Sequence, residues 1–414
     1  MTPEVKNRIE QIRHGNVPDG YKHSAAGIIP EDWEIHTASE HLVESYIPGS
    51  TGDVAKKITV KLWNKGVVEK KEVHIGSENT KYYRRKTGQF IYSKLDFLNC
   101  AFGIIPKELN GYESTLDLPA FDINDIEPFY LLSQVTQRRF YERWGVMAAN
   151  GGRKARRISP EDFLAFPITV PCMEEQTKIA EILTAQDKVI ELKEKRLVEK
   201  QRQKKYLMQQ LLTGKKRLPG FDGEWKKTPL KTLLKERKTY SPKGTEYPHV
   251  TLSTEGIYAK SDRYDRDHLV KDEETEYKIT LKGDICYNPA NLKFGVICIN
   301  NFGDAIFSPI YVTFEVVGNV SSSFLSNYLM RWDFINAVRK YEEGTVYERM
   351  AVKPEDFLKF EMMLPPYDEQ VAIAEILSVA DREIELLRQN LEQEKQKKKV
   401  LMQLLLTVVV RVQQ

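Results

Sequence analysis

The sequence predicts an α+β protein in which two globular domains of mixed α/β structure alternate with two long helices that pair as an antiparallel coiled coil. The first observation is an internal repeat, because the segment PEDFL at residues 160–164 returns at residues 354–358, a shift of 194 residues. The second is a seven-residue spacing of apolar side chains after each copy. The third is a series of short apolar or alternating segments before each copy, which is typical of strands. Together they predict two similar halves related by a pseudo-twofold repeat.

The repeat keeps the same shift over a long stretch. The segment IAEIL occurs at residues 179–183 and 373–377, and LMQ occurs at residues 207–209 and 401–403. Roughly half of the positions from 160 to 213 recur identically in the second copy, which chance does not produce. We infer that a whole helical segment is repeated.

Residues 1–172 are expected to form the first globular domain. Residues 89–92 and 101–105 are rich in aromatic and β-branched side chains and predict strands, whereas residues 107–111 have the composition of a turn. A helix is expected from Glu127 to about Arg143. A mixed globule of roughly 150 residues has the usual size of one domain.

Residues 173–216 are expected to form the first long helix. Glu174 and its acidic neighbour suit a helix start, and Thr213-Gly214 suits its end. The seven-residue series contains one lysine: Leu183, Ile190, Leu197, Lys204 and Leu211. A helix of about 40 residues is on the order of 60 Å long, so we interpret the pair as a spacer. The alternative is two amphipathic helices that hold a core and expose solvated charged faces.

Residues 217–366 are expected to form the second globular domain, and residues 367–414 the second long helix. Strands are predicted at residues 295–299 and 310–316, with a turn at residues 300–304. A helix is expected from Ser322 to about Lys340. The second series of seven-residue spacings is Leu377, Ile384, Leu391, Lys398 and Leu405.

The composition is that of a folded globular protein, with 414 residues, of which 41% are hydrophobic and 29% charged. The net charge of +3 is too small to identify a partner by itself. No apolar run approaches the ~20 residues of a membrane span, and the start lacks the apolar segment of a secretory signal, so we expect a cytoplasmic protein. The four cysteines include no Cys-x-x-Cys pair, so neither structural zinc nor a disulfide framework is expected.

Positive charge is concentrated in local clusters, which predict surfaces that meet phosphate groups. The segment at residues 81–86 contains four basic residues and two tyrosines, and a second basic run follows the flexible Asn150-Gly151-Gly152. In the second domain, the loop at residues 288–293 offers amides that suit adenine. The candidate DNA-binding residues are Lys81, Arg84, Arg85, Lys94, Arg153, Lys154, Arg156, Arg157, Asn288, Asn291, Lys293 and Arg349. Solvated faces and ordinary turn chemistry are the alternative interpretations.

The sequence contains no enzyme signature. It has no Gly-x-x-x-x-Gly-Lys-Ser/Thr loop and no Gly-x-Gly-x-x-Gly after a strand, so nucleotide hydrolysis is not expected. Residues 288–291 (NPAN) lack the second proline and the aromatic residue of an amino-methyltransferase motif. The adjacent carboxylates Glu161 and Asp162 suit a helix start better than acid/base catalysis. A stand-alone enzyme, such as a methyltransferase fragment, would need a cofactor site.

These segments resemble the DNA-specificity subunits of type I restriction-modification systems, in which two target recognition domains alternate with two conserved helical regions. The resemblance covers nearly the whole chain. Its most specific elements are the two PEDFL segments, the EQxxIAEIL segments at residues 175–183 and 369–377, and the LLT segments at residues 211–213 and 405–407. One departure is Val408-Val409, which replaces the Gly214-Lys215 of the first copy.

The resemblance implies a non-catalytic, DNA-binding subunit. Its target recognition domains, residues 1–172 and 217–366, would each read one half of a bipartite, asymmetric DNA site. The helical regions, residues 173–216 and 367–414, would set the spacing between the half-sites and dock two modification (methyltransferase) subunits, which methylate DNA, as well as restriction subunits. The alternative is a non-catalytic coiled-coil scaffold that binds nucleic acid non-specifically.

The resemblance also assigns cofactors and a docking surface. It implies no cofactor in this chain, because S-adenosylmethionine, ATP and Mg are expected on the partner subunits. The residues implied to bind the modification subunits are Glu175, Gln176, Ile179, Ile182, Glu369, Gln370, Ile373 and Ile376.

Overall fold

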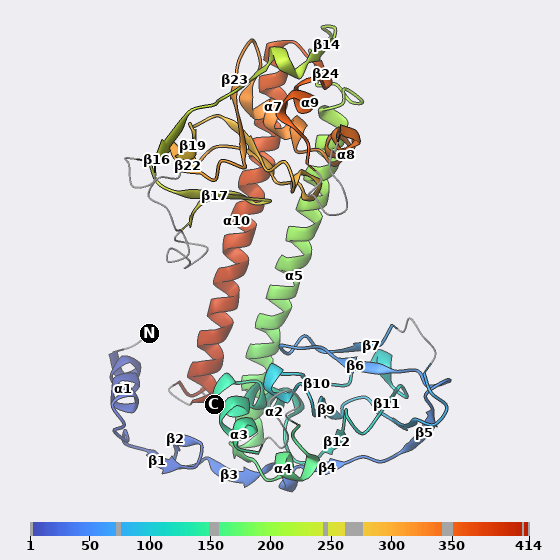
Figure 1. Cartoon of the computed structure of the whole chain (residues 1–414). Coiled ribbons are helices and arrows are strands. Elements are labelled where there is room, and N and C mark those ends of the chain that lie inside the picture. Colours follow the sequence, from blue (N-terminus) through green and yellow to red (C-terminus); the bar gives the residue numbers. More distant parts are fainter. Residues whose placement is uncertain are drawn as a thin grey trace. The chain divides into compact units, whose positions relative to one another are not determined.

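The computed structural model describes residues 3–71, 76–148, 157–242, 247–260, 276–341, 351–407 and 410–412. The chain divides into two compact units: Met1–Glu194 with Asn390–Gln414, and Lys195–Gln389. The unit boundaries cross both long helices, α5 (Met173–Leu211) and α10 (Tyr367–Leu406), each of which contributes one half to each unit (Figure 1). They cross the helices because each globular region packs on the start of one helix and the end of the other.

The first unit is built from short antiparallel strands with helices packed at the start of α5. Its strands are β1 (Tyr21–Ser24), β2 (Gly27–Pro30), β3 (Glu34–Thr37), β4 (Leu42–Glu44), β5 (Pro48–Thr51), β6 (Ile58–Val60), β7 (Val67–Glu69), β8 (Lys81–Arg84), β9 (Phe90–Tyr92), β10 (Phe102–Ile104), β11 (Glu113–Ser114), β12 (Ala120–Ile123) and β13 (Pro167–Val170). The helices before α5 are α1 (Pro3–Arg13), α2 (Pro128–Val135), α3 (Arg138–Ala148) and α4 (Pro160–Leu164). The largest sheet has the order β10-β9-β12-β4, and the smaller ones are β11-β8-β5, β6-β7, β13-β3 and β1-β2.

The second unit repeats this topology. Its strands are β14 (Lys226–Pro229), β15 (Leu234–Glu236), β16 (Tyr240–Pro242), β17 (Val250–Ser253), β18 (Gly256–Ala259), β19 (Glu276–Thr280), β20 (Ile285–Tyr287), β21 (Ile297–Ile299), β22 (Ala305–Phe307), β23 (Val312–Val316) and β24 (Glu361–Leu364). Its short helices include α7 (Ser322–Leu329), α8 (Trp332–Val338) and α9 (Pro354–Leu358). The sheets β21-β20-β23-β15, β22-β19-β16, β17-β18 and β24-β14 match four sheets of the first unit, so the structural repeat extends beyond the repeated sequence.

The PEDFL motif anchors the core of each unit. Its proline occupies the first turn of α4 and of α9, where the missing N–H group costs nothing. Its phenylalanine is fully buried: Phe163 stacks on Phe90 with ring centroids 5.4 Å apart, and Phe357 stacks on Tyr287 at 4.9 Å. The motif therefore recurs because both units need the same side chain in the same position.

The helices expected at residues 127–143 and 322–340 are each broken into two. The first ends at Val135 (α2) and resumes at Arg138 (α3), and the hydroxyl of Thr136 between them donates a 2.8 Å hydrogen bond to the Leu132 carbonyl. In the second unit, α7 ends before Arg331, whose guanidinium donates to the carbonyl of Leu212 at the end of α5. The predicted single helices were therefore wrong, because the apolar pattern of the sequence does not show a break of two residues.

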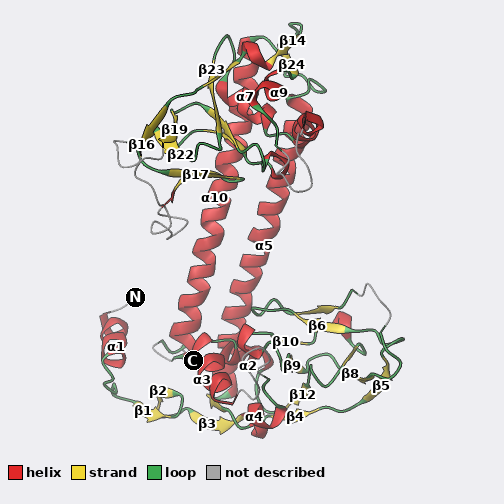
Figure 2. Ribbon diagram, viewed as in Figure 1, coloured by secondary structure: helices red, strands yellow, loops and turns green. Residues whose placement is uncertain are grey.

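The long helices pair in antiparallel orientation within each unit, as expected. In the first unit, Asp187 binds Lys398 at 2.5 Å and Lys193 binds Glu394 at 2.7 Å, so α5 and α10 run in opposite directions. In the second unit, Lys204 binds Asp381 at 2.5 Å, and this is the same ion pair shifted by 194 residues. Figure 2 shows the contrast between the short strands and loops and these two continuous helices. The lysine predicted within each seven-residue series is thus an ion-pair position.

Candidate nucleic-acid interface

The first candidate surface lies on the sheet β11-β8-β5 of the first unit. The outer residues of β8, Lys81 and Arg84, are exposed, while the two tyrosines between them are half-buried. The ring of Tyr83 packs edge-on against Tyr46 at 6.1 Å, and the ammonium of Lys57 lies 5.4 Å from the ring of Tyr82. Exposed cations beside positioned aromatic rings are typical of surfaces that contact nucleic acid.

Arg85 has a structural role inside the first unit. Its side chain is fully buried, and its guanidinium donates to the Ser114 hydroxyl at 2.8 Å and to the carbonyls of Ser45 at 2.8 Å and Leu118 at 3.2 Å. Burial lowers the pKa of Arg85 to about 10. Because this buried guanidinium is used within the unit, Arg85 is not available to contact DNA.

A second group of candidates meets at the start of the β9–β10 connection. The N–H of Lys94 donates to the Asp117 carbonyl at 2.9 Å, and Arg157 forms an ion pair with the carboxylate of the same residue at 3.4 Å. The N–H of Ile158 donates to the carbonyl of Lys94 at 3.2 Å. The structure therefore brings Lys94 and Arg157 together, although 63 positions separate them. Arg153, Lys154 and Arg156 lie outside the described residues.

In the second unit, the corresponding connection between β20 and β21 carries the amide candidates. Asn288 is buried, and its side-chain oxygen accepts from the N–H groups of Ala290 at 3.1 Å and Asn291 at 3.3 Å. This is ordinary turn chemistry, so Asn288 shapes the loop. Asn291 is exposed, and the Lys293 ammonium lies 5.3 Å from the ring of Phe294. Arg349 lies outside the described residues.

Sequence reasoning missed Phe294, an aromatic side chain next to these candidates. Its ring is 64% exposed, which is unusual for a large apolar side chain and marks a surface that can stack or pack on a ligand. The available signal was an aromatic residue directly after Lys293 in a polar loop. The N–H of Val352 donates to the carbonyl of Pro289 at 3.3 Å, as Ile158 does to Lys94 in the first unit. The candidates on the β9–β10 connection and those on the β20–β21 connection thus occupy related places in the repeat.

The Glu-Gln pairs at the helix starts are internal contacts. Glu175 accepts from the indole N–H of Trp33, and Glu369 accepts from that of Trp225, each at 3.1 Å. The guanidinium groups that bind these carboxylates are those of Arg411 and Arg217, respectively. We therefore find the arginine contact of the first copy repeated after Val408-Val409, despite the different residues there.

Gln176 and Gln370 also have matched roles. The side-chain oxygen of Gln176 accepts from the Glu127 N–H at 2.9 Å, and that of Gln370 accepts from the Ser321 N–H at 2.8 Å. Ile179 and Ile373 are buried in the two cores. Among the eight residues assigned to partner docking, Ile182 and Ile376 alone are exposed, each at 37%.

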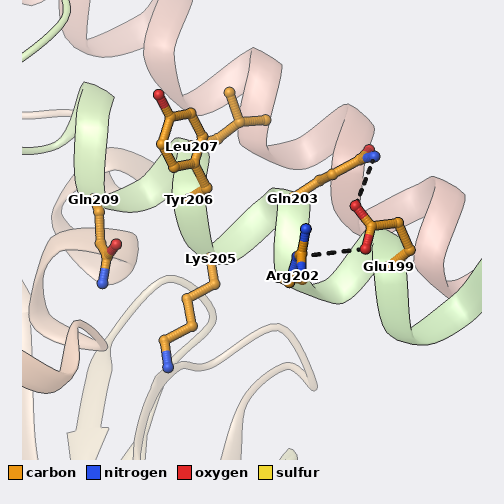
Figure 3. Close-up of a pocket in the computed structure, with 7 residues that line it drawn as sticks. All are labelled: Glu199, Arg202, Gln203, Lys205, Tyr206, Leu207 and Gln209. Carbon is orange, nitrogen blue, oxygen red and sulfur yellow. Dashed lines mark hydrogen bonds and ion pairs between the residues drawn. The ribbon is translucent and has the colours of Figure 1, made fainter.

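The exposed face of α5 carries a surface depression of about 570 Å³ within the second unit. Figure 3 shows that Arg202 and Gln203 both approach the carboxylate of Glu199 and that Lys205 extends in another direction. All lining residues belong to α5: Glu199, Arg202, Gln203, Lys205, Tyr206, Leu207 and Gln209. A depression on one helix is an open surface and offers no enclosed reaction site.

The described part of the chain offers neither a metal site nor a membrane-spanning helix. There, no group of three or more His, Cys, Asp and Glu side chains could hold a metal ion. The helices of the same residues include none that is long and apolar enough to cross a membrane.

Comparisons with known proteins agree with this picture. A family model described as the type I restriction modification DNA specificity domain matches residues 50–200 and again residues 224–395. The chain is 24% identical over 440 residues to a putative type I restriction enzyme specificity subunit from Methanocaldococcus jannaschii, and the match covers 95% of this chain and 97% of that one. The two family matches follow the repeat seen in the structure.

Solved structures share the fold. A type I restriction-modification S subunit from M. genitalium has a TM-score of 0.56 at 11% identity, with 90% of this chain and 96% of that chain covered. A chain from a study of complex assembly and conformational transition of the type I R-M system has a TM-score of 0.54 at 14% identity, with 92% and 99% covered. At such low identity the likeness supports the fold alone.

Proposed function

This chain belongs to the family of type I restriction-modification DNA-specificity proteins, and from this premise we propose that each unit reads one half of a bipartite, asymmetric DNA site. The chain is the non-catalytic DNA-recognition component of such a system. One observation carries the proposal. The two units share their topology and the arginine–glutamate contact at the start of each long helix, but they present different candidate surfaces. Because base recognition depends on the exposed side chains, the two halves of the site should differ in sequence.

The proposed contacts are those described candidates whose side chains are exposed or partly exposed. In the first unit they are Lys81, Arg84, Lys94 and Arg157, and arginine can bind a guanine edge through two hydrogen bonds. In the second unit they are Asn291 and Lys293, and an asparagine amide can pair with adenine. The proposal also includes the candidates outside the described residues, Arg153, Lys154, Arg156 and Arg349.

We further propose that the paired helices set the spacing between half-sites and dock two modification subunits. The repeated helices of 39 and 40 residues support this, because two copies of one surface suit two copies of one partner. Ile182 and Ile376 are the docking positions that remain exposed. S-adenosylmethionine, ATP and Mg are assigned to the modification and restriction subunits.

Selection from a randomised duplex library tests DNA recognition. The chain is co-expressed with its modification subunit, and retained DNA is sequenced at stated salt concentrations. We expect two short, unrelated motifs at one constant spacing. Exchange of the second globular region, residues 217–366, with that of another family member should change one motif and leave the other. Diffuse, salt-sensitive retention without motifs would contradict the proposal and favour a non-specific scaffold.

Native mass spectrometry tests the docking surface. Ile182→Glu and Ile376→Glu should each remove one modification subunit from the complex, because a carboxylate is costly to bury in an apolar interface. Val198→Glu is a matched control, since Val198 is exposed on α5 and the equivalent position of the repeat is Glu392. Retention of two modification subunits by the Ile182→Glu, Ile376→Glu double variant would contradict this docking assignment.

A further inference from the structure

A groove of about 550 Å³ in the first unit is lined by the turn after β6, the start of α3 and the last turns of α10. Its lining includes no carboxylate and five cationic side chains: Arg138, Arg139, Lys395, Lys398 and Lys399. The indole of Trp63, which is 59% exposed, also lines it. We propose that this groove binds the phosphate backbone of duplex DNA independently of base sequence. The proposal rests on the DNA-recognition function above and adds a contact surface to it.

The backbone around the groove is strained. Trp63, Asn64 and Cys100 have φ angles of 59°, 52° and 54°, and in the described residues the only other non-glycine with a positive φ is Asp125. The left-handed region is unfavourable for most side chains, and such residues cluster at functional sites. The Trp63 N–H donates to the Asn99 carbonyl at 2.9 Å, so a hydrogen bond joins the turn at Trp63 and Asn64 to the turn at Cys100.

Stability does not explain a tryptophan at this position. Asparagine and glycine are the residues that suit a left-handed turn, whereas a bulky side chain there is an outlier. The ring of Trp63 is not needed to fill a core, because most of its surface is exposed. An exposed indole beside cations can pack against the sugar and base edges of a nucleic acid whose phosphates meet the cations.

Positive charge remains in the groove after internal ion pairs are counted. Carboxylates outside the lining bind three of the cations: Arg138 to Glu142 at 2.7 Å, Lys395 to Glu194 at 3.1 Å and Lys398 to Asp187 at 2.5 Å. Arg139 donates to the Leu406 carbonyl, which carries no charge. The described carboxylates form no ion pair with Lys399. Arg139 and Lys399 therefore offer charge-assisted hydrogen bonds to an entering phosphate.

The repeat supplies an internal comparison. At the second-unit positions that correspond to the five cations by the 194-residue shift, the sequence has two lysines, one aspartate, one tryptophan and one glutamine. Trp332 and Asp333 occupy the repeat positions of Arg138 and Arg139, and Lys205 occupies that of Lys399. Since both units adopt the same topology, the fold does not require a basic groove. A ligand with negative charge accounts for the difference.

The test uses the full-length chain in complex with its modification subunit and a duplex of random sequence. Lys399→Ala should weaken binding about threefold to tenfold and reduce the slope of log affinity against log salt by about one unit, because one phosphate contact is lost. Trp63→Asn should also weaken binding while leaving the melting temperature unchanged or higher. Lys205→Ala, at the same repeat position in the second unit, should change neither quantity.

Each contrary outcome has a distinct meaning. Unchanged affinity and salt slope in Lys399→Ala would overturn the groove assignment, while selected half-sites would leave the bipartite function standing. An equal loss of DNA affinity in Lys205→Ala would overturn the assignment as well, because the effect would then come from the positive charge of the long helices in general. Loss of a modification subunit from the native mass spectrum would show a protein-docking groove instead. Persistence of the Lys399 effect without any half-site preference would support the groove and contradict the proposed function.

Discussion

Arg411 and Glu175 are 236 positions apart in the sequence, and two hydrogen bonds of 2.9 Å join the guanidinium of the first to the carboxylate of the second. The same guanidinium binds Asp32 through hydrogen bonds of 2.9 and 2.8 Å. In the second unit, Arg217 binds Glu369 at 2.6 and 2.7 Å. An arginine that follows each long helix therefore binds the buried carboxylate at the start of the other one.

Loss of Arg411 should destabilise the first unit. Arg411→Ala leaves the Glu175 carboxylate, only 6% exposed, without its cation. Removal of one partner from a buried ion pair costs about 3–5 kcal/mol, but the arginine is partly exposed, so we expect about 1–3 kcal/mol. Urea denaturation of the full-length chain measures the loss.

Two further variants give that measurement its controls. Arg388→Ala removes an exposed arginine of α10 and should change stability little. Glu175→Gln in the Arg411→Ala background should recover part of the lost stability, because the unpaired charge is removed. Equal stability of Arg411→Ala and Arg388→Ala would contradict a role for this contact in closing the unit.

Gln176→Ala and Gln370→Ala should have similar costs, since the two amides make equivalent contacts. Besides accepting from a backbone N–H, Gln176 donates to the Pro171 carbonyl and Gln370 to the Pro365 carbonyl, each at 2.9 Å. Unsatisfied buried groups cost ~1–3 kcal/mol. Denaturation should show this loss in both variants but not in Gln209→Ala, which truncates an exposed amide. A large loss of stability in only one of the two variants would mean that the two glutamine contacts are not equivalent.

The neighbours Arg84 and Arg85 should separate DNA binding from stability. Arg84→Ala, at an exposed position, should weaken DNA binding by ~1–3 kcal/mol with little change in melting temperature, provided that the side chain makes a bidentate base contact. Arg85→Ala should lower the melting temperature, because it removes three internal hydrogen bonds. DNA-binding assays and thermal denaturation of both variants measure the two effects separately. A stable Arg85→Ala protein with weakened DNA binding would reverse the assignment.

The ion pairs between the long helices should weaken in acid. A hydrogen bond from Lys193, followed by one from Gln186, lowers the pKa of Glu394 below its ordinary value. A lowered pKa means that the stabilisation is complete above the unfolded value near 4.3 and is lost as the pH falls through the folded value. The denaturation midpoint of the wild-type protein should therefore be higher than that of Glu394→Gln at pH 7. This difference between the two midpoints should vanish in strong acid. A difference that stays constant with pH would exclude carboxylate ionisation as its cause.

Much of the architecture follows from local sequence patterns. The PEDFL segments predict the helix starts at Pro160 and Pro354, and the seven-residue series predict the long helices α5 and α10. The second helical region was predicted as residues 367–414, whereas α10 ends at Leu406. These features are visible in the sequence because helix initiation and apolar periodicity depend on residues a few positions apart. The strands β9, β10, β21 and β23 follow from short apolar runs for the same reason.

The sequence by itself determined the repeat, the α+β class, the long helices and the family. Tertiary structure decided which members of each motif face outward. Arg85 belongs to a basic run yet is buried, and Glu175 belongs to a repeated polar pair yet binds an arginine far away in the sequence. It also gathered Trp63, Arg139 and Lys399 into one groove. Exposure and ion pairing depend on segments that approach only after folding, so local sequence patterns do not reveal them.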